Sequence, residues 1–365
     1  MARKFTSTAV SMSEAPSRLT AGLLTTDVPR VSTSQAEQIA AQIYGLDGVA
    51  QVLGGERDSN FCLTTLSGRA YMLRFVNPAE VPAEVDFQTA ILSHLARRDS
   101  ALPVPRLQQS RSGELTPQVD VAGQTLTLRA VSYLPGTAQY QVPRSKTLMR
   151  ALGETLARLD IALSDFEHPG AARDLLWDIS DMSRLHGLLP HLTDPEQRRT
   201  IARVLDSHQQ KVMPASPQLR RQVIHNDLNA HNVLVSSADP QRLAGIIDFG
   251  DALMAPLINE LATALAYQLD GEGSDLFHFC HPMIAAYTAR QPLTEAELEL
   301  LPELVASRLA LSLLIAQHRA VLYPQNRDYI LRNQAHAWGS LSRLMTLPFS
   351  QTGEIFRQCC ASELK

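Results

Sequence analysis

Three oxygen-bearing side chains stand in two short polar segments, each of which follows an apolar run. Asp227 and Asn232 lie in the loop after residues 223–224, which are Val and Ile, and Asp248 follows the run 245–247. Apolar runs rich in Val and Ile that end abruptly in polar residues are typical of buried strands. We expect two antiparallel strands to bring the polar residues at their ends close together.

One carboxylate, one amide and a second carboxylate in one place favour phosphoryl transfer. Mg²⁺ prefers hard oxygen ligands and usually keeps waters and substrate phosphates in its shell. Asn232 and Asp248 are suitable ligands, which leaves Asp227 to accept the proton of an alcohol. The order His-x-Asp, four residues, Asn, and later Asp-Phe-Gly is that of the catalytic and metal loops of protein kinases. The alternative is a polar loop that merely caps two buried strands.

Composition narrows the class of protein. With 365 residues the chain exceeds one typical core, which predicts two lobes or domains. Its 45% hydrophobic and 19% charged residues are typical of a soluble globular protein, and a net charge of −4 gives no reason to expect a nucleic-acid partner. The four cysteines have neither metal-ligand spacing nor a disulfide pattern, which favours reduced thiols in a cytoplasmic protein. No apolar run approaches the ~20 residues that span a bilayer, so no membrane partner is expected.

The N-terminal region is predicted to order only after a leader. Residues 1–30 are predicted to be flexible, since they are rich in Ser, Thr and Ala and lack the compact apolar core of a signal peptide. A helix is predicted to follow, with Ser34 and Glu37 as its capping box. Two strands are then predicted, at 61–65 and 70–75.

The turn before these strands, residues 54–60, contains Gly and Ser. Backbone N–H groups in such a turn can bind phosphate oxygens. An ordinary hairpin turn gives the same pattern and is the alternative.

A cation and an acid flank the junction between strand and helix. Arg74 stands near the end of the second strand, and Glu84 lies in the first turn of a helix predicted at 82–95. A strand cation paired with a helix acid holds the α- and β-phosphates in kinases, and Arg makes bidentate phosphate contacts that Lys cannot. The plainer alternatives are a surface strand residue and an acid that is merely favoured at a helix N-terminus.

A turn is predicted to join the lobes. Strands predicted at 118–121 and 124–133 end in the sequence Tyr-Leu-Pro-Gly, a turn signature. We interpret this turn as the hinge and expect backbone groups from Val131 to Tyr133 to hydrogen-bond an adenine edge; a plain strand end is the alternative. Helices are predicted beyond it at residues 148–163, 194–212, 257–267, 274–289, 295–320 with an interruption at Pro302, and 329–344.

With these segments in this order, the chain resembles the aminoglycoside phosphotransferase-like family, small-molecule kinases that share the protein-kinase fold. It is most similar to the branch that contains hydroxylysine kinases and the kinase domains joined to class III aminotransferases. The resemblance covers roughly residues 31–344. It rests on residues 55–61, 84–88, 133–136, 177–178, 225–235, 248–251 and 308–312, with a later Pro324, Asn326 and Tyr329.

The resemblance implies an α+β, protein-kinase-like bilobal fold. A small antiparallel β N-lobe with one helix, at residues 31–136, would bind the nucleotide. A larger, mainly helical C-lobe, at 137–365, would hold the catalytic loop and the substrate. ATP and Mg²⁺ are the implied cofactors.

The implied site residues are Asp227 as catalytic base, Asn232 and Asp248 as Mg²⁺ ligands, and Ser59, Asn60, Arg74, Glu84, Val131 and Tyr133 around the nucleotide. The chain departs from the family pattern at two positions. Arg74 stands where Lys is common, and the helix position that often carries the pairing Glu falls on Gln88. The partner of Arg74 is therefore left open between Glu84 and Gln88.

The residues and the resemblance together predict an ATP-dependent phosphotransferase that phosphorylates a hydroxyl of a small amino alcohol or hydroxy amino acid, hydroxylysine-like or ethanolamine-like. Asp178 is predicted near a substrate ammonium and Arg308 or Arg319 near a carboxylate, although packing or surface roles also explain them. Homoserine and aminoglycosides are alternative acceptors, and a catalytically silent nucleotide-binding module is the alternative to an enzyme. A monomer or homodimer is expected.

Overall fold

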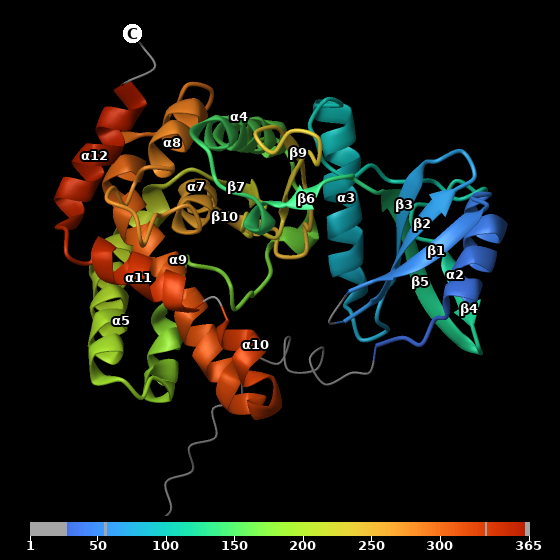
Figure 1. Ribbon diagram of the computed structural model, residues 1–365, viewed down its shortest axis with the longest axis horizontal. Coiled ribbons are helices and arrows are strands. Elements are labelled where there is room, and N and C mark those ends of the chain that lie inside the picture. Colours follow the sequence, from blue (N-terminus) through green and yellow to red (C-terminus); the bar gives the residue numbers. More distant parts are fainter. Residues whose placement is uncertain (1–27, 55–56, 333, 362–365) are drawn as a thin grey trace, which may run out of the picture.

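Two lobes make up the protein in the computed structural model, which describes residues 28–54, 57–332 and 334–361. The smaller lobe contains a five-stranded sheet, and α3 (Pro82–Arg98) stands between this sheet and the helical lobe (Figure 1). The predicted α+β architecture, an antiparallel sheet followed by a mainly helical lobe, is confirmed. Residues 1–27 of the predicted leader, and Gly55 and Glu56 of the predicted phosphate turn, lie outside the described residues.

The sheet of the N-lobe has the order β1-β2-β3-β5-β4, and every neighbouring pair is antiparallel. Its strands are β1 (Gly48–Leu53), β2 (Ser59–Thr65), β3 (Ala70–Phe75), β5 (Gln124–Ser132) and β4 (Gln118–Val121). The register aligns Asn60 with Arg74 and Arg74 with Arg129. Residues predicted to contact phosphates therefore lie on adjacent strands.

The first helix begins earlier than the sequence pattern predicts. α2 (Thr33–Ile39) is capped by Ser32, which forms a reciprocal capping box with Gln35, so the box predicted at Ser34 and Glu37 is wrong. Ser32 has the extended backbone that an N-cap requires, with φ −82° and ψ 159°, whereas Ser34 is already inside the helix. Glu37 instead accepts a backbone N–H of β1 at 2.8 Å.

α3 belongs to the core of the larger lobe. Its buried residues Phe87, Ile91 and Leu95 join the same apolar cluster as Leu152 of α4 (Lys146–Leu163). The sheet has a separate core beneath α2. α3 therefore packs as part of the larger lobe, although it stands beside the sheet.

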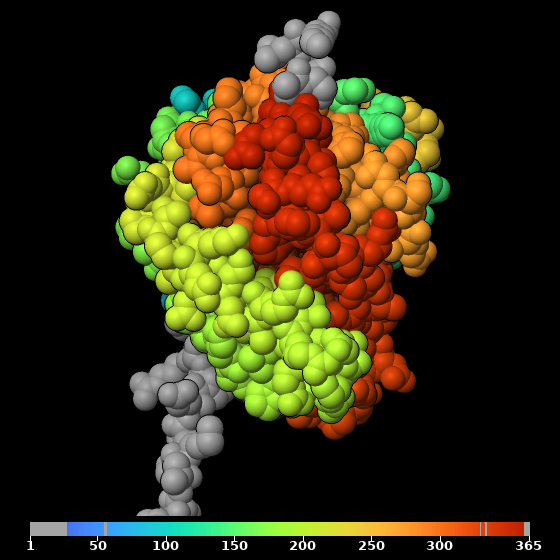
Figure 2. Space-filling view, turned by 90° about the vertical axis from the view of Figure 1, so that its left-hand side faces the viewer, coloured from blue at the N-terminus to red at the C-terminus, as the bar shows by residue number. Residues whose placement is uncertain are grey.

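The helical lobe holds most of the remaining chain. Its helices are α4, α5 (Pro195–Ser207), α6 (Met213–Ala215), α7 (Ile258–Ala266), α8 (Cys280–Thr288), α9 (Glu295–Leu322), α10 (Arg327–Leu331), α11 (Gln334–Leu344) and α12 (Phe349–Ala361). Short 3-10 or π-helical segments are η1 (Ala40–Tyr44) in the N-lobe and η2 (Gln139–Gln141), η3 (Pro169–Ala171), η4 (Ser183–His191), η5 (His208–Val212), η6 (Ser216–Gln218) and η7 (Pro324–Asn326) beyond it. The C-terminal helices, red in Figure 2, cover the outer end of the lobe, where α12 packs on α8 and α9. Within the described residues, no helix has the length and apolar character needed to cross a membrane.

Two helix predictions in this lobe are wrong in detail. The helix predicted at 274–289 begins only at Cys280, and the interruption predicted at Pro302 is absent because α9 runs through it. A proline inside a helix removes one backbone hydrogen bond, but this one is buried. A Cβ added to Gly353 of α12 would lie 3.8 Å from its ring, so packing against a neighbouring helix offsets the loss.

Two small antiparallel ladders carry the loops that contain Asp227 and Asp248. β7 (Arg221–Ile224) pairs with β10 (Leu253–Pro256), and β8 (Val233–Val235) lies between β6 (Thr137–Ala138) and β9 (Leu243–Ile246). The start of β8 is opposite the end of β9, in the register Val233 to Ile246. This pairing brings the residue before β8 beside the residues after β9, as the sequence pattern predicts.

Gly153 of α4 approaches the backbone of α8 too closely for a side chain. A Cβ there would lie 2.2 Å from the Met283 carbonyl oxygen. We expect Gly153→Ala to lower the free energy of unfolding, measured with urea, by about 1–3 kcal/mol through overpacking. In an open helix the same change is favourable by ~1 kcal/mol.

Gly187→Ala is the matched control, because nothing lies within 4 Å of a Cβ at that position. We expect its stability to change by no more than about 0.5 kcal/mol. A Gly153→Ala protein as stable as the wild type would contradict the close contact between α4 and α8.

Candidate active site

The Asp227 carboxylate is held on both of its oxygens. Oδ1 accepts from Arg308 Nη2 at 2.8 Å, and Oδ2 accepts from Asn232 Nδ2 at 2.8 Å and from Asn229 Nδ2 at 2.9 Å. The side chain is 19% exposed, whereas that of Arg308 is 1% exposed. Asp227 is therefore a fixed carboxylate with restricted access to solvent, which suits a base that must meet one hydroxyl in one orientation.

Buried groups fix the loop that carries this carboxylate. The His225 ring, fully buried, accepts the Asp227 N–H on Nδ1 at 3.3 Å, so Nε2 donates to the Ile247 carbonyl at 3.0 Å. Asn226 has a left-handed backbone with φ 64°, and its N–H donates to Glu260 Oε2 at 2.9 Å. His225 thereby ties the catalytic loop to the segment that leads into Asp248.

Asn232 and Asp248 present oxygens that fit a hard metal ion. The Asn232 side-chain amide points its NH₂ at Asp227, which leaves Oδ1 available. The main-chain carbonyl of Asn232 accepts the Ile247 N–H at 2.9 Å. Asp248 is exposed, with φ 65°, and one carboxylate oxygen accepts the Gly250 N–H at 3.0 Å. No group of three or more His, Cys, Asp or Glu in the described part of the chain is suited to a metal. An ion on Asn232 and Asp248 would need phosphates and waters to complete its shell, as Mg²⁺ usually does.

Burial and nearby charges raise the pKa values of two aspartates, Asp227 and Asp251. Burial raises the pKa of Asp227, and the Arg308 guanidinium and the hydrogen bonds from Asn229 and Asn232 draw it only partly back. Asp251, to which the sequence analysis gave no role, has its pKa raised to about 6 by burial and by the charges of Asp227 and Asp248. The Arg308 guanidinium thus offsets only part of the burial and mutual repulsion of these carboxylates, which favour protonation or bound positive charge.

Arg74 has three side-chain partners, whereas the sequence left one partner open between Glu84 and Gln88. Nε donates to Asp58 at 2.5 Å, Nη2 to Glu80 at 3.2 Å and Nη1 to Gln88 Oε1 at 3.0 Å. Between the two candidates in α3, Gln88 is the partner, and a pair between Arg74 and Glu84 is not formed. Glu84, one turn earlier in the helix, accepts from Arg173 of the helical lobe instead.

Burial lowers the pKa of Arg74, but the carboxylates of Asp58, Glu80 and Asp248 outweigh it, so the pKa stays above its usual value. Asp248 of the other lobe is one of the charges that contribute to this rise. Arg129, directly across from Arg74 on β5, donates to the same Gln88 oxygen at 3.1 Å. Burial and the neighbouring Arg74 lower the pKa of Arg129 to about 9.

Glu84 forms a bridge between the lobes. Its carboxylate accepts from Arg173 Nη2 at 2.7 Å, and Arg173 Nη1 donates to the Gly250 carbonyl at 2.9 Å. Both side chains are largely buried, at 17% and 11% exposed. Arg173, in the loop after η3, therefore connects the first turn of α3 to the loop that carries Asp248. Neither a motif nor a period in the sequence marks Arg173.

The remaining predicted nucleotide residues lie along β2 and at the end of β5. Ser59 Oγ donates to the Pro29 carbonyl, and Oδ1 of Asn60 is buried without a hydrogen-bond partner. Val131 is paired with β3 and buried, and the Tyr133 N–H donates to the Ala70 carbonyl at 2.9 Å. The backbone of Val131 and the N–H of Tyr133, both predicted near the adenine, are thus engaged in the sheet.

The two predicted substrate residues lie in different surroundings. Asp178 is half-buried and accepts the Ser180 N–H at 2.8 Å. Arg308 is buried and donates to Asp227, to Tyr267 and to the Trp177 carbonyl. The structure therefore brings Arg308 to Asp227 and engages its guanidinium there.

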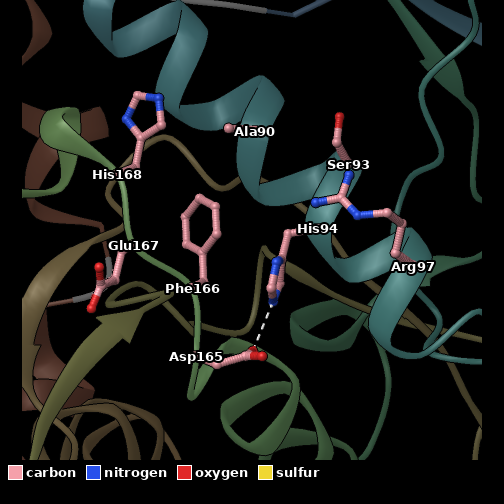
Figure 3. A pocket seen from close by; sticks show the side chains of 8 residues that line it. All are labelled: Ala90, Ser93, His94, Arg97, Asp165, Phe166, Glu167 and His168. Atoms are coloured by element: carbon pink, nitrogen blue, oxygen red, sulfur yellow. Dashed lines mark ion pairs between the residues drawn. The ribbon is translucent and has the colours of Figure 1, made fainter.

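A hollow of about 500 Å³ lies elsewhere, between α3 and the segment after α4 (Figure 3). Phe166 lies between His94 and His168, and His94 contacts Asp165 at 3.2 Å. None of the residues placed in the catalytic and nucleotide regions above lines this hollow.

Glu84→Gln is expected to raise the apparent dissociation constant of the Mg²⁺–nucleotide complex about three- to tenfold, or ~0.7–1.4 kcal/mol. The reason is that Arg173 loses its charged partner and then holds the Gly250 carbonyl less firmly. Titration with a fluorescent nucleotide measures the change. Arg173→Met should have a similar effect, and the double variant should be no worse than either single one. Additive losses would show that the two residues act separately.

Asp251→Asn is expected to stabilise the metal-free protein at pH 8 by about 1–3 kcal/mol and to have no such effect near pH 4. A carboxyl whose pKa is raised to about 6 on folding destabilises the fold above that pH, and this penalty disappears below its unfolded pKa. Urea unfolding in a chelator at both pH values measures the difference. Asp181→Asn is the control of opposite sign, because a hydrogen bond from Ser183 lowers the pKa of Asp181. Equal effects of Asp251→Asn at both pH values would contradict the assignment.

Comparison with known proteins identifies the family of the chain. The model of the phosphotransferase enzyme family, APH, matches residues 48–293. A hydroxylysine kinase of Danio rerio is 28% identical over 332 residues, which are 87% of this chain and 93% of that protein. A homoserine kinase of Methylobacterium radiotolerans is 29% identical over 278 residues, 73% of this chain and 79% of that protein.

The solved structure of a microcompartment-associated aminopropanol kinase matches with a TM-score of 0.66 at 21% identity, covering 86% of this chain and 97% of that one. This likeness confirms the predicted protein-kinase-like fold. The family match spans both the sheet that carries Arg74 and the loops that carry Asp227 and Asp248. The chain therefore belongs to the APH phosphotransferase enzyme family and is a kinase, as its sequence motifs predict.

Proposed function

We propose that this protein transfers the γ-phosphoryl group of ATP to a hydroxyl of a small amino alcohol or hydroxy amino acid. One observation carries the proposal. A carboxylate, Asp227, is held on one oxygen by a buried guanidinium and on the other by two amides, beside Asn232 and near Asp248. Such a constellation orients a hydroxyl and removes its proton during phosphoryl transfer.

Asn232 and Asp248 would hold Mg²⁺, whose charge offsets that of the phosphates in this class of reaction. The protein itself contributes the position of the base. Asp227 accepts the proton of the acceptor hydroxyl, and its raised pKa suits that task better than the pKa of an exposed aspartate.

The nucleotide would lie between β2, β3 and the hinge. Arg74 is the cation for its phosphates, supported by Asp58, Glu80 and Gln88. Backbone groups alternate in direction along an antiparallel strand. The Ser132 N–H faces away from β3 and bonds to the Arg106 carbonyl, which leaves the Ser132 carbonyl for a purine amino group.

An acceptor with an amine is supported by the relatives and by the charge of the site. Three similar proteins are named as kinases of hydroxylysine, homoserine and aminopropanol, and each of these compounds carries an amino group and a hydroxyl. Asp251 supplies negative charge near Asp227, and the partly exposed Asp178 follows Trp177, whose carbonyl accepts from Arg308. Homoserine or an aminoglycoside is the second candidate acceptor. A silent nucleotide-binding module is disfavoured because Asp227, Asn232 and Asp248 are all in place.

Asp227→Asn is expected to reduce kcat by about 10²–10⁴-fold. Asn keeps an oxygen for Arg308, so folding and nucleotide binding should persist, with a dissociation constant within about threefold of wild type. Coupled release of ADP measures kcat, and calorimetry measures nucleotide affinity. Asp239→Asn, in the exposed turn between β8 and β9, is the control and should keep wild-type turnover. An Asp227→Asn enzyme of normal rate would remove Asp227 as the base.

The acceptor is identified by release of ADP from Mg²⁺–ATP in the presence of hydroxylysine, homoserine, ethanolamine, aminopropanol and an aminoglycoside, each tested separately. Mass spectrometry of the products should show one added phosphate on the compound turned over. Nucleotide binding without release of ADP under any of these acceptors would favour the silent module instead.

A further inference from the structure

Arg308 lies in the middle of α9 and is almost completely buried, at 1% exposed. Its guanidinium donates to Asp227 Oδ1 at 2.8 Å, to the Trp177 carbonyl at 3.0 Å, and to the Tyr267 hydroxyl at 3.1 and 3.3 Å. These acceptors come from three separate segments: the catalytic loop, the C-terminal cap of α7 and the loop before η4.

A cation without solvent contact is unfavourable unless acceptors surround it. The guanidinium satisfies this condition through several donors in one rigid plane, which a Lys ammonium cannot match. The Arg308 guanidinium carbon also lies 5.6 Å from the ring centroids of both Trp177 and Tyr267, where cation–π attraction adds to the hydrogen bonds. The orientation of Arg308 is therefore determined by its surroundings before any substrate binds.

The two ends of the guanidinium face two different parts of the reaction site. Nη2 holds the base, and Nη1 holds the carbonyl of Trp177, the residue before Asp178. Asp178 is fixed in turn by its hydrogen bond from the Ser180 N–H. A single buried residue thus links Asp227 to the loop that carries Asp178, which the sequence predicts near the acceptor.

We propose that Arg308 is a positioning residue that holds Asp227 and the Trp177–Asp178 loop in one arrangement, rather than the cation that binds a substrate carboxylate. The inference rests on the proposed kinase function and deepens it. Arg308 does not touch the acceptor; it orients the carboxylate oxygen that does. Without Arg308, Asp227 and the Trp177–Asp178 loop would both be present but misaligned, and small misalignments reduce turnover strongly.

The test compares Arg308→Lys with wild type on two acceptors, an amino alcohol and a hydroxy amino acid that is turned over. We expect kcat to fall about 10–100-fold by the same factor for both acceptors. KM for both acceptors and the dissociation constant for Mg²⁺–ATP should stay within about threefold. A rise in KM confined to the acceptor that carries a carboxylate, with kcat retained, would overturn the proposal in favour of substrate binding.

Tyr267→Phe keeps the inference testable if Arg308→Lys does not fold. It removes one acceptor from the guanidinium and changes little volume, so the protein should fold with a lowered thermal midpoint, because a buried donor loses its partner. We expect kcat to fall about three- to tenfold at unchanged KM, a smaller loss than that of Arg308→Lys. Wild-type kcat in a folded Tyr267→Phe enzyme would overturn the role of the network.

Arg220→Lys is the matched control for loss of an arginine–carboxylate pair. Arg220 pairs at 2.6 Å with Glu297, whose side chain is 0% exposed and lies in the first turn of α9. That site is about 16 Å along the helix from Arg308, at ~1.5 Å per residue. Arg220→Lys should lower the thermal midpoint but keep kcat, whereas equal losses of kcat in both variants would mean that Arg308 acts only through stability.

Failure of this inference is distinguishable from failure of the proposed function. A wild-type protein that turns over no acceptor would sink the proposed function. An active wild type with an equally active, folded Arg308→Lys would sink the positioning role alone.

Discussion

A buried carboxylate must be matched by donors, and this requirement organises the helical lobe around Asp227. Charge comes from Arg308 in the middle of α9, and hydrogen bonds come from Asn229 and Asn232 in the same loop. Because Arg308 is buried as well, it needs acceptors of its own, and Tyr267 is one of them. α9 is therefore part of the core and also supports Asp227, so the packing of this helix and the position of the Asp227 carboxylate cannot vary separately.

The loop that carries Asp248 is tied to both of its neighbours. His225 donates to the carbonyl of Ile247 from the side of the catalytic loop, and Arg173 donates to that of Gly250 while it pairs with Glu84 of α3. Since α3 packs into the core of the helical lobe, α3 and the lobe that carries Asp248 are joined by apolar contacts as well as by the ion pair of Glu84 and Arg173. Movement of one lobe relative to the other would have to break or rearrange these contacts.

Like charges stand side by side in the N-lobe, where Arg74 and Arg129 face each other on adjacent strands and share an oxygen of Gln88. Such a pair is unfavourable by itself, and Asp58 and Glu80 offset it on the side of Arg74. The difference in surroundings explains why the pKa of Arg129 falls to about 9 while that of Arg74 is raised.

Local sequence determined the elements and the reacting groups, because apolar periodicity and a short run such as 225–232 depend only on neighbours along the chain. The strands, α3 and the amide and carboxylates of the catalytic and metal loops follow from such patterns. Contacts between distant residues were decided by the tertiary structure: Arg308 of α9 pairs with Asp227, and the partner of Glu84 is Arg173, not Arg74. A side chain finds its partner through the packing of helices, and spacing along one segment carries no information about the segment that packs against it.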